Sequence, residues 1–135
     1  MEVTTQSASQ TQKFGQEFAN KLRGGEVVAL VGDLGSGKTT FVQGLAKGLG
    51  VKQRIISPTF ILMRNYNHFY HLDLYRLEDN VWEEVKNLGV EEIWDNPDNV
   101  VVIEWAEKIH DHLPKDVIWI QFESEGKNKR GITIR

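Results

Sequence analysis

The sequence has no cysteine, only three prolines among its 135 residues, and no long apolar run. Without thiols the chain can form no disulfide, no thiolate metal site and no cysteine nucleophile. Its polar beginning has no apolar stretch of signal-peptide length, and its short apolar runs argue against a membrane span. We therefore expect a soluble, unprocessed protein of the reducing cytoplasm, with no role at a membrane.

The chain also has no large excess of one charge. Sixteen Lys and Arg against 19 Asp and Glu leave a formal net charge of −3, which is too mild for a general nucleic-acid-binding protein. Any nucleic acid must be bound locally or through another protein. The average hides an asymmetry, because residues 34–77 hold six bases and one acid whereas residues 78–98 hold eight acids and one base. The acidic stretch is either a solvated helical face or a docking surface for a basic partner.

The length and the order of apolar segments indicate one domain over residues 1–135, since a typical domain has roughly 150 residues. Apolar residues at every fourth position predict a helix over Ser9–Arg23, and the continuous apolar runs Val27–Val31 and Val100–Ile103 suit strands buried on both faces. Further strands are predicted at 59–66, 69–75, 117–122 and 132–134, helices after the glycine-rich turn at 32–37, at 80–88 and at 91–94, and a helix or turn at 106–112. The alternation is typical of an α/β protein.

A glycine-rich segment, Gly32–Thr39, matches the phosphate-binding pattern G-x-x-x-x-G-K-[ST] without a mismatch. It lies between a predicted buried strand and a predicted helix, as that pattern requires. Its glycines allow successive N–H groups to turn inward, and those groups together with the helix N-terminus form a site for phosphate oxygens. We therefore expect a P-loop NTPase-like three-layer sandwich with a mostly parallel central sheet, which binds a nucleoside triphosphate with Mg²⁺.

The residue types assign roles within this site. Lys38 supplies a charge near the β and γ phosphates, the Thr39 hydroxyl ligates Mg²⁺, and Thr40 is within reach of the α phosphate. Glu104 directly follows a buried strand, which is the Walker B position for a second carboxylate that orients Mg²⁺. The loop residues predicted to line the phosphates are Gly35, Ser36 and Gly37.

Two other classes of P-loop protein remain as alternatives. A GTP-dependent switch selects guanine with Asn-Lys-x-Asp, but here Asn128-Lys129 is followed by Arg130-Gly131, which favours ATP. A small-molecule kinase needs an acceptor pocket and usually an arginine-rich lid. The stretch after Glu104 carries only Lys108 and Lys115 before the last basic turn.

Four segments taken together resemble one family. They are Gly32–Thr40, Ser57-Pro58-Thr59-Phe60, His71-Leu72-Asp73-Leu74-Tyr75-Arg76 and Ile103-Glu104-Trp105. In this order they resemble the bacterial TsaE (YjeE) family, a small ATPase needed for threonylcarbamoyladenosine at position 37 of tRNAs that read ANN codons. The resemblance implies a weak ATPase that acts with the TsaB and TsaD proteins and meets tRNA only through that complex.

The resemblance also implies roles for residues outside the loop. Asp73 is expected near the γ phosphate, where it ligates Mg²⁺ through water or orients the attacking water. Ser57 and Thr59 match a second switch-like segment, Thr11 matches a threonine near the nucleotide base, and Arg130 matches a basic turn.

Three residues next to Asp73 and Glu104 in the sequence can be explained by a structural role as well as by a functional one. Packing and a hydrogen bond would account for His71 and for Tyr75, which face the same side of a strand as Asp73. Trp105 is either a core residue or a gate over the metal.

Overall fold

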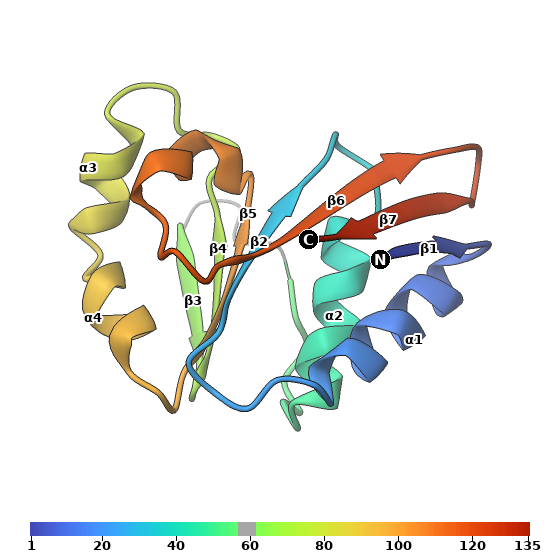
Figure 1. Cartoon of the computed structure of the whole chain (residues 1–135), viewed down its shortest axis with the longest axis horizontal. Coiled ribbons are helices and arrows are strands. Elements are labelled where there is room, and N and C mark those ends of the chain that lie inside the picture. The colour runs from blue at the N-terminus through green and yellow to red at the C-terminus, as the bar shows by residue number, and fades with distance from the viewer. Residues whose placement is uncertain (57–61) are drawn as a thin grey trace.

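The computed structural model describes residues 1–56 and 62–135, and helices alternate with strands along the chain (Figure 1). The elements in chain order are β1 (Glu2–Thr5), α1 (Ala8–Ala19), β2 (Val27–Val31), α2 (Lys38–Gly48), β3 (Met63–Tyr66), β4 (Phe69–Asp73), α3 (Val81–Lys86), α4 (Val90–Asp95), β5 (Val100–Glu104), the 3₁₀ helix η1 (Ala106–His112), β6 (Ile118–Ser124) and β7 (Arg130–Ile134). The predicted α/β class is confirmed.

The strands form one seven-stranded sheet in the order β1-β7-β6-β2-β5-β4-β3. The four central strands, β6, β2, β5 and β4, are parallel to one another. Strands β2 and β5 in the middle are the two continuous apolar runs, as expected for strands covered on both faces. Hairpins bring β3 and β7 back antiparallel, and β1 joins β7 antiparallel. The sheet is thus mixed, with the predicted parallel arrangement confined to its centre.

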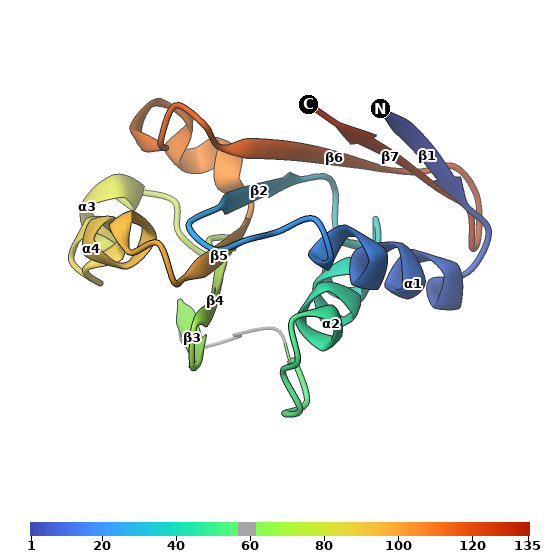
Figure 2. The same cartoon turned by 60° about the horizontal axis from the view of Figure 1, so that its bottom comes forward.

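Helices cover both faces of the sheet, which makes three layers (Figures 1 and 2). Helices α1 and α2 pack on one face through a core cluster that includes Phe18, Phe41 and Leu45. Helices α3, α4 and η1 cover the other face through a cluster that includes Val85 and Trp94. The predicted three-layer architecture is therefore confirmed. The parallel strands β2, β4 and β5 end at one edge of the sheet, which is where ligands bind in open α/β sheets.

Two features near the N-terminus differ from the sequence prediction. Strand β1 was not predicted, because its period-two pattern extends over only four residues and its partner β7 lies at the other end of the chain. Helix α1 begins after Ser7, whose hydroxyl accepts from Gln10 N, and ends at Ala19 instead of Arg23. The chain then continues in tight turns in which Lys21 N and Leu22 N donate to the carbonyls three residues before them.

The predicted strand hairpin is shorter than expected. Its strands are β3 and β4, and Asn67 in the turn has a φ of 65°, a left-handed conformation that asparagine tolerates. Strand β4 ends at Asp73, because a turn closed by a hydrogen bond from Leu77 N to Leu74 O follows. The predicted strand residues 59–61, together with Ser57, lie outside the described residues.

Helices α1 and α2 approach each other closely because glycines lie between them. A Cβ atom added at Gly44 would lie 1.8 Å from Gln12 O, and one added at Gly15 would lie 2.3 Å from Phe41 O. Both distances are far below van der Waals contact, so only a hydrogen atom fits at these positions.

We expect Gly44→Ala to lower the free energy of unfolding by about 2–3 kcal/mol, because the two backbones must separate and the core below them loses contact. The higher helix propensity of alanine offsets only about 1 kcal/mol of this loss. Urea denaturation measures the difference. Lys47→Ala on the exposed side of the same helix is the matched control and should stay within about 0.5 kcal/mol of wild type. An unchanged midpoint for Gly44→Ala would show that the helices separate freely.

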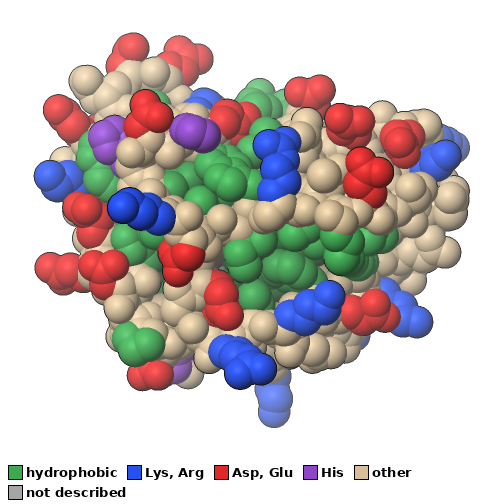
Figure 3. Space-filling view, viewed as in Figure 1, with side chains coloured by type: hydrophobic (Ala, Val, Ile, Leu, Met, Phe, Trp, Pro, Cys, Tyr) green, Lys and Arg blue, Asp and Glu red, His purple; other side chains and the backbone are tan. Residues whose placement is uncertain are grey.

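The surface over α3 and α4 is acidic. All eight acids of residues 78–98 are exposed, and Figure 3 shows acidic side chains along the left-hand side of the molecule, where these helices lie. This agrees with a solvated helical face.

Within the two described ranges, no helix has the length and apolar character that crossing a bilayer requires.

Candidate functional site

The glycine-rich loop connects the end of β2 to the start of α2. Gly35 and Gly37 have φ values of 76° and 102°, which lie in the left-handed region that favours glycine. Gly37 is the N-cap of α2, and no side chain caps the helix there. A helix N-terminus without a side-chain cap favours an anion in front of the loop.

Lys38 lies folded back onto the loop that carries it. Its Nζ donates to Gly32 O and, at 3.4 Å, to Asp33 O, and lies 4.0 Å from the centre of the Trp105 ring. The residue is only 4% exposed. Burial lowers the pKa of Lys38 below its ordinary value, while the nearby carboxylates, Glu104 first among them, act in the opposite direction. The ammonium thus contacts two backbone carbonyls and an aromatic ring face. An anionic ligand in the cleft would compete for these contacts.

Glu104 ends β5 with both carboxylate oxygens engaged. Oε1 lies 3.4 Å from the Thr39 hydroxyl, which donates to it, and Oε2 lies 2.6 Å from His71 Nε2. A hydroxyl and a carboxylate side by side are the protein ligands expected of Mg²⁺ that is also held by phosphates. Among the residues described, no three His, Cys, Asp or Glu side chains converge into a metal site of their own. Thr39 and Glu104 therefore fit a Mg²⁺ ion that a nucleotide brings with it.

Asp73 lies beside Glu104 because β4 and β5 are parallel and in register at these two residues. Its Oδ1 accepts a hydrogen bond of 3.0 Å from Tyr75 N. Partial burial raises the pKa of Asp73, and the backbone hydrogen bond from Tyr75 opposes that shift. The carboxyl thus faces the same space as Glu104 while the turn that follows β4 holds it in place.

An aromatic wall closes this end of the site. Trp105 has a φ of 60°, and its ring centre lies 5.2 Å from that of Tyr75. Lys108 Nζ donates to Tyr75 O at 2.8 Å and to Leu77 O at 2.7 Å, so it ties the turn after β4 to η1. Sequence reasoning left Trp105 open between core and gate, and its partly exposed ring lines the cleft. The sequence analysis gave Lys108 no role. The only sequence signal for such a role is that Lys108 follows Glu104 by about one helical turn.

The opposite end of the site is formed by α1 and the turn before β7. Thr11 is 1% exposed, and its hydroxyl lies 2.6 Å from that of Thr5 and donates to Ser7 O. The Thr11 hydroxyl is therefore already engaged in two hydrogen bonds within the protein. Arg130, which the sequence placed in the turn, is the first residue of β7. Its side chain extends over Gly37 and donates to the carbonyls of Gly126 and Lys129 in the preceding turn.

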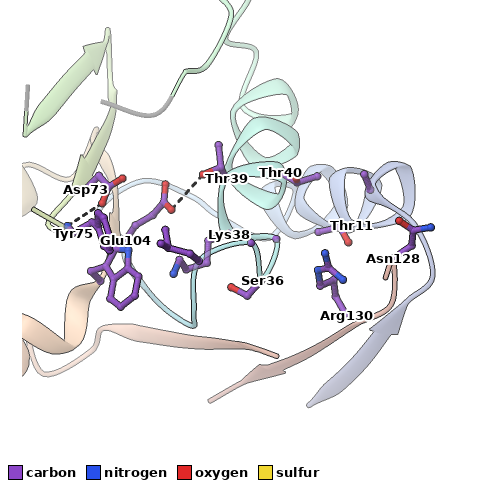
Figure 4. A pocket seen from close by; sticks show the side chains of 15 residues that line it. Thr11, Ser36, Lys38, Thr39, Thr40, Asp73, Tyr75, Glu104, Asn128 and Arg130 are labelled. Atoms are coloured by element: carbon purple, nitrogen blue, oxygen red, sulfur yellow. Dashed lines mark hydrogen bonds between the residues drawn. The ribbon is translucent and has the colours of Figure 1, made fainter. Parts of the chain in front are cut away.

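One cleft contains the described residues that the sequence assigned to the site. Figure 4 shows Asp73, Glu104 and Lys38 at one end and Thr11, Asn128 and Arg130 at the other. The assigned residues that line the cleft are Thr11, Gly35, Ser36, Gly37, Lys38, Thr39, Thr40, Asp73, Glu104 and Arg130. Asn128 also lines it and was missed as a site residue, because the basic turn has no pattern that marks it. Ser57 and Thr59 lie outside the described part of the chain.

Comparison with known proteins identifies the family of the chain. The family profile described as "Threonylcarbamoyl adenosine biosynthesis protein TsaE" matches residues 5–132. The chain belongs to the TsaE family. The Bacillus subtilis "tRNA threonylcarbamoyladenosine biosynthesis protein TsaE" is 37% identical over 96% of this chain and 82% of its own length. The Treponema pallidum TsaE is 37% identical over 99% of both chains. The crystal structure of Bacillus subtilis YdiB superposes with a TM-score of 0.81 at 31% identity, covering 99% of this chain and 83% of that one.

Proposed function

We propose that this TsaE-family chain is an ATPase required for threonylcarbamoyladenosine formation in ANN-decoding tRNAs, and that it acts in the cytoplasm with TsaB and TsaD. The observation that carries the proposal is the meeting of the glycine-rich loop with Thr39, Asp73 and Glu104 in one cleft. The pathway is inferred from membership of the TsaE family. The site itself supports phosphate binding next to a divalent cation.

The described contacts suggest how the chain would hold ATP with Mg²⁺. The loop amides and the start of α2 would bind phosphate oxygens, and Lys38 would exchange its carbonyl contacts for them. Thr39 and Glu104 would hold the metal, whose charge would offset that of the phosphates. The carboxyl of Asp73 would orient the attacking water. Thr11 and Arg130 would border the base and sugar.

The cleft has few cationic side chains to stabilise the charge that would develop during phosphoryl transfer. Lys38 and Arg130 are the cationic side chains that line it within the described residues, and Arg130 donates to carbonyls of the turn that precedes β7. P-loop proteins that lack an arginine directed at the phosphates hydrolyse slowly until a partner supplies one. We therefore propose a weak activity in the isolated chain and a faster one with its partners.

We expect the chain to co-purify with TsaB and TsaD in the presence of ATP, and its depletion to lower threonylcarbamoyladenosine in ANN-decoding tRNAs. Mass spectrometry of digested tRNA measures the modification, and wild-type and Lys47→Ala chains should both restore it. Unchanged modification after depletion would contradict the proposed pathway. Separately, a hydrolysis rate that TsaB and TsaD leave unaltered would contradict partner dependence.

A further inference from the structure

His71 and Glu104 form a closed pair on the neighbouring strands β4 and β5. His71 Nε2 lies 2.6 Å from Glu104 Oε2, and the two side chains are 0% and 3% exposed. His71 registers with Val102, so it contacts the glutamate diagonally across the sheet, on the face that α2 covers. This contact is well shielded from water, unlike the exposed pair of His110 and Asp111.

The surroundings of the ring determine its tautomer. Nδ1 of His71 is buried and has no hydrogen-bond partner within residues 1–56 and 62–135. A proton on Nδ1 would therefore be a buried donor without an acceptor, which costs about 1–3 kcal/mol. A proton on Nε2 points directly at a carboxylate oxygen. The hydrogen-bond network thus places the ring proton on Nε2, which donates to Glu104.

This bond controls which way the glutamate points. With Oε2 held by His71, the carboxylate plane is fixed and Oε1 faces the Thr39 hydroxyl at 3.4 Å. Without the bond, the carboxylate could rotate about its terminal torsion, which has a broad, shallow energy profile. Partners of this kind orient metal-ligating carboxylates in many proteins.

We propose that His71 is a positioning residue, which orients the Glu104 carboxylate toward a divalent cation at Thr39. The inference rests on the proposed function, because the cation is the one that the nucleotide would bring. His71 does not line the cleft, so its effect would pass through Glu104. Binding of the cation should therefore depend on His71, whereas binding of the metal-free nucleotide should not.

Three variants separate positioning from packing. His71→Leu removes the donor and keeps much of the volume, and His71→Asn removes it in a second way because its shorter amide does not reach the Nε2 position. His71→Gln restores a donor near that position. His110→Leu is the matched control, since it removes a histidine next to a carboxylate at an exposed site. Thermal unfolding identifies which variants remain folded.

The measurements are the affinity of Mn²⁺ for the ADP-saturated chain, followed by electron paramagnetic resonance, and the affinity of ADP without metal. We expect His71→Leu and His71→Asn to weaken Mn²⁺ binding about tenfold, with His71→Gln and His110→Leu close to wild type. Metal-free ADP affinity should stay unchanged in all of them. In the metal-free wild-type chain, ¹⁵N spectra of the His71 ring should show the Nε2–H tautomer.

Three results would overturn the inference. One is unchanged Mn²⁺ affinity in a folded donor-free variant, and another is an equal loss of metal-free ADP affinity, which would indicate general damage to the site. The third is an Nδ1–H tautomer. A wild-type chain that binds no ADP would instead contradict the proposed function, so the two failures are distinguishable.

Discussion

Replacing Lys38 by alanine is expected to lower the affinity for ATP about 100-fold, because the variant loses the charged donor nearest to the phosphates. A hydrogen bond to a charged group contributes up to about 3 kcal/mol, which corresponds to roughly that factor. Isothermal titration calorimetry with ATP and Mg²⁺ measures the change. Lys47→Ala removes an exposed charge from the same helix and should bind ATP as wild type does.

The Lys38→Ala variant should still fold, which makes the binding result interpretable. Burial lowers the pKa of Lys38, so the folded protein does not favour this charge, and its contacts are with the loop itself and one tryptophan face. Circular dichroism should match wild type. ATP binding by the folded variant within about threefold of wild type would show that the loop amides and the helix N-terminus bind the phosphates without help.

The parts of the site that lie next to each other in the chain were predictable from sequence. The loop is bounded by the apolar run of β2 and by the glycine at the start of α2, and Glu104 directly follows the apolar run of β5. In each case, a few consecutive residues specify the local backbone. The role of Lys38 follows in the same way, since the pattern places it in the first turn of the helix.

The parts that depend on strand pairing were not predictable. The bond between His71 and Glu104 exists because β4 lies beside β5 in parallel register, and no local pattern determines that pairing. The hydroxyl contact between Thr5 and Thr11 likewise depends on β1, which pairs with β7 at the opposite end of the sequence. Sequence reasoning therefore identified residues that line the cleft better than the residues that support them.

Glu104→Gln is expected to lower the rate of ATP hydrolysis about 100-fold while metal-free ADP binds as before. The amide keeps the volume of the side chain, and its carbonyl oxygen still accepts from His71, but the charge that would hold Mg²⁺ beside Thr39 is gone. Loss of about 2.7 kcal/mol of metal-mediated stabilisation of the transition state corresponds to that factor. Hydrolysis is measured as phosphate release at saturating ATP, and ADP affinity by calorimetry without metal.

Two further variants separate the metal role of Glu104 from its packing. Glu107→Gln removes an exposed carboxylate whose charge also acts on Lys38, and it should leave hydrolysis within about threefold of wild type. Glu104→Ala also leaves His71 without its buried acceptor and opens a cavity, so we expect it to lose about 2–4 kcal/mol of stability in addition to activity.

Equal loss of ADP binding and hydrolysis in the folded Glu104→Gln variant would assign this residue to the framework of the site. Retained ADP binding with hydrolysis lost would assign it to the metal, because only the charge has been removed.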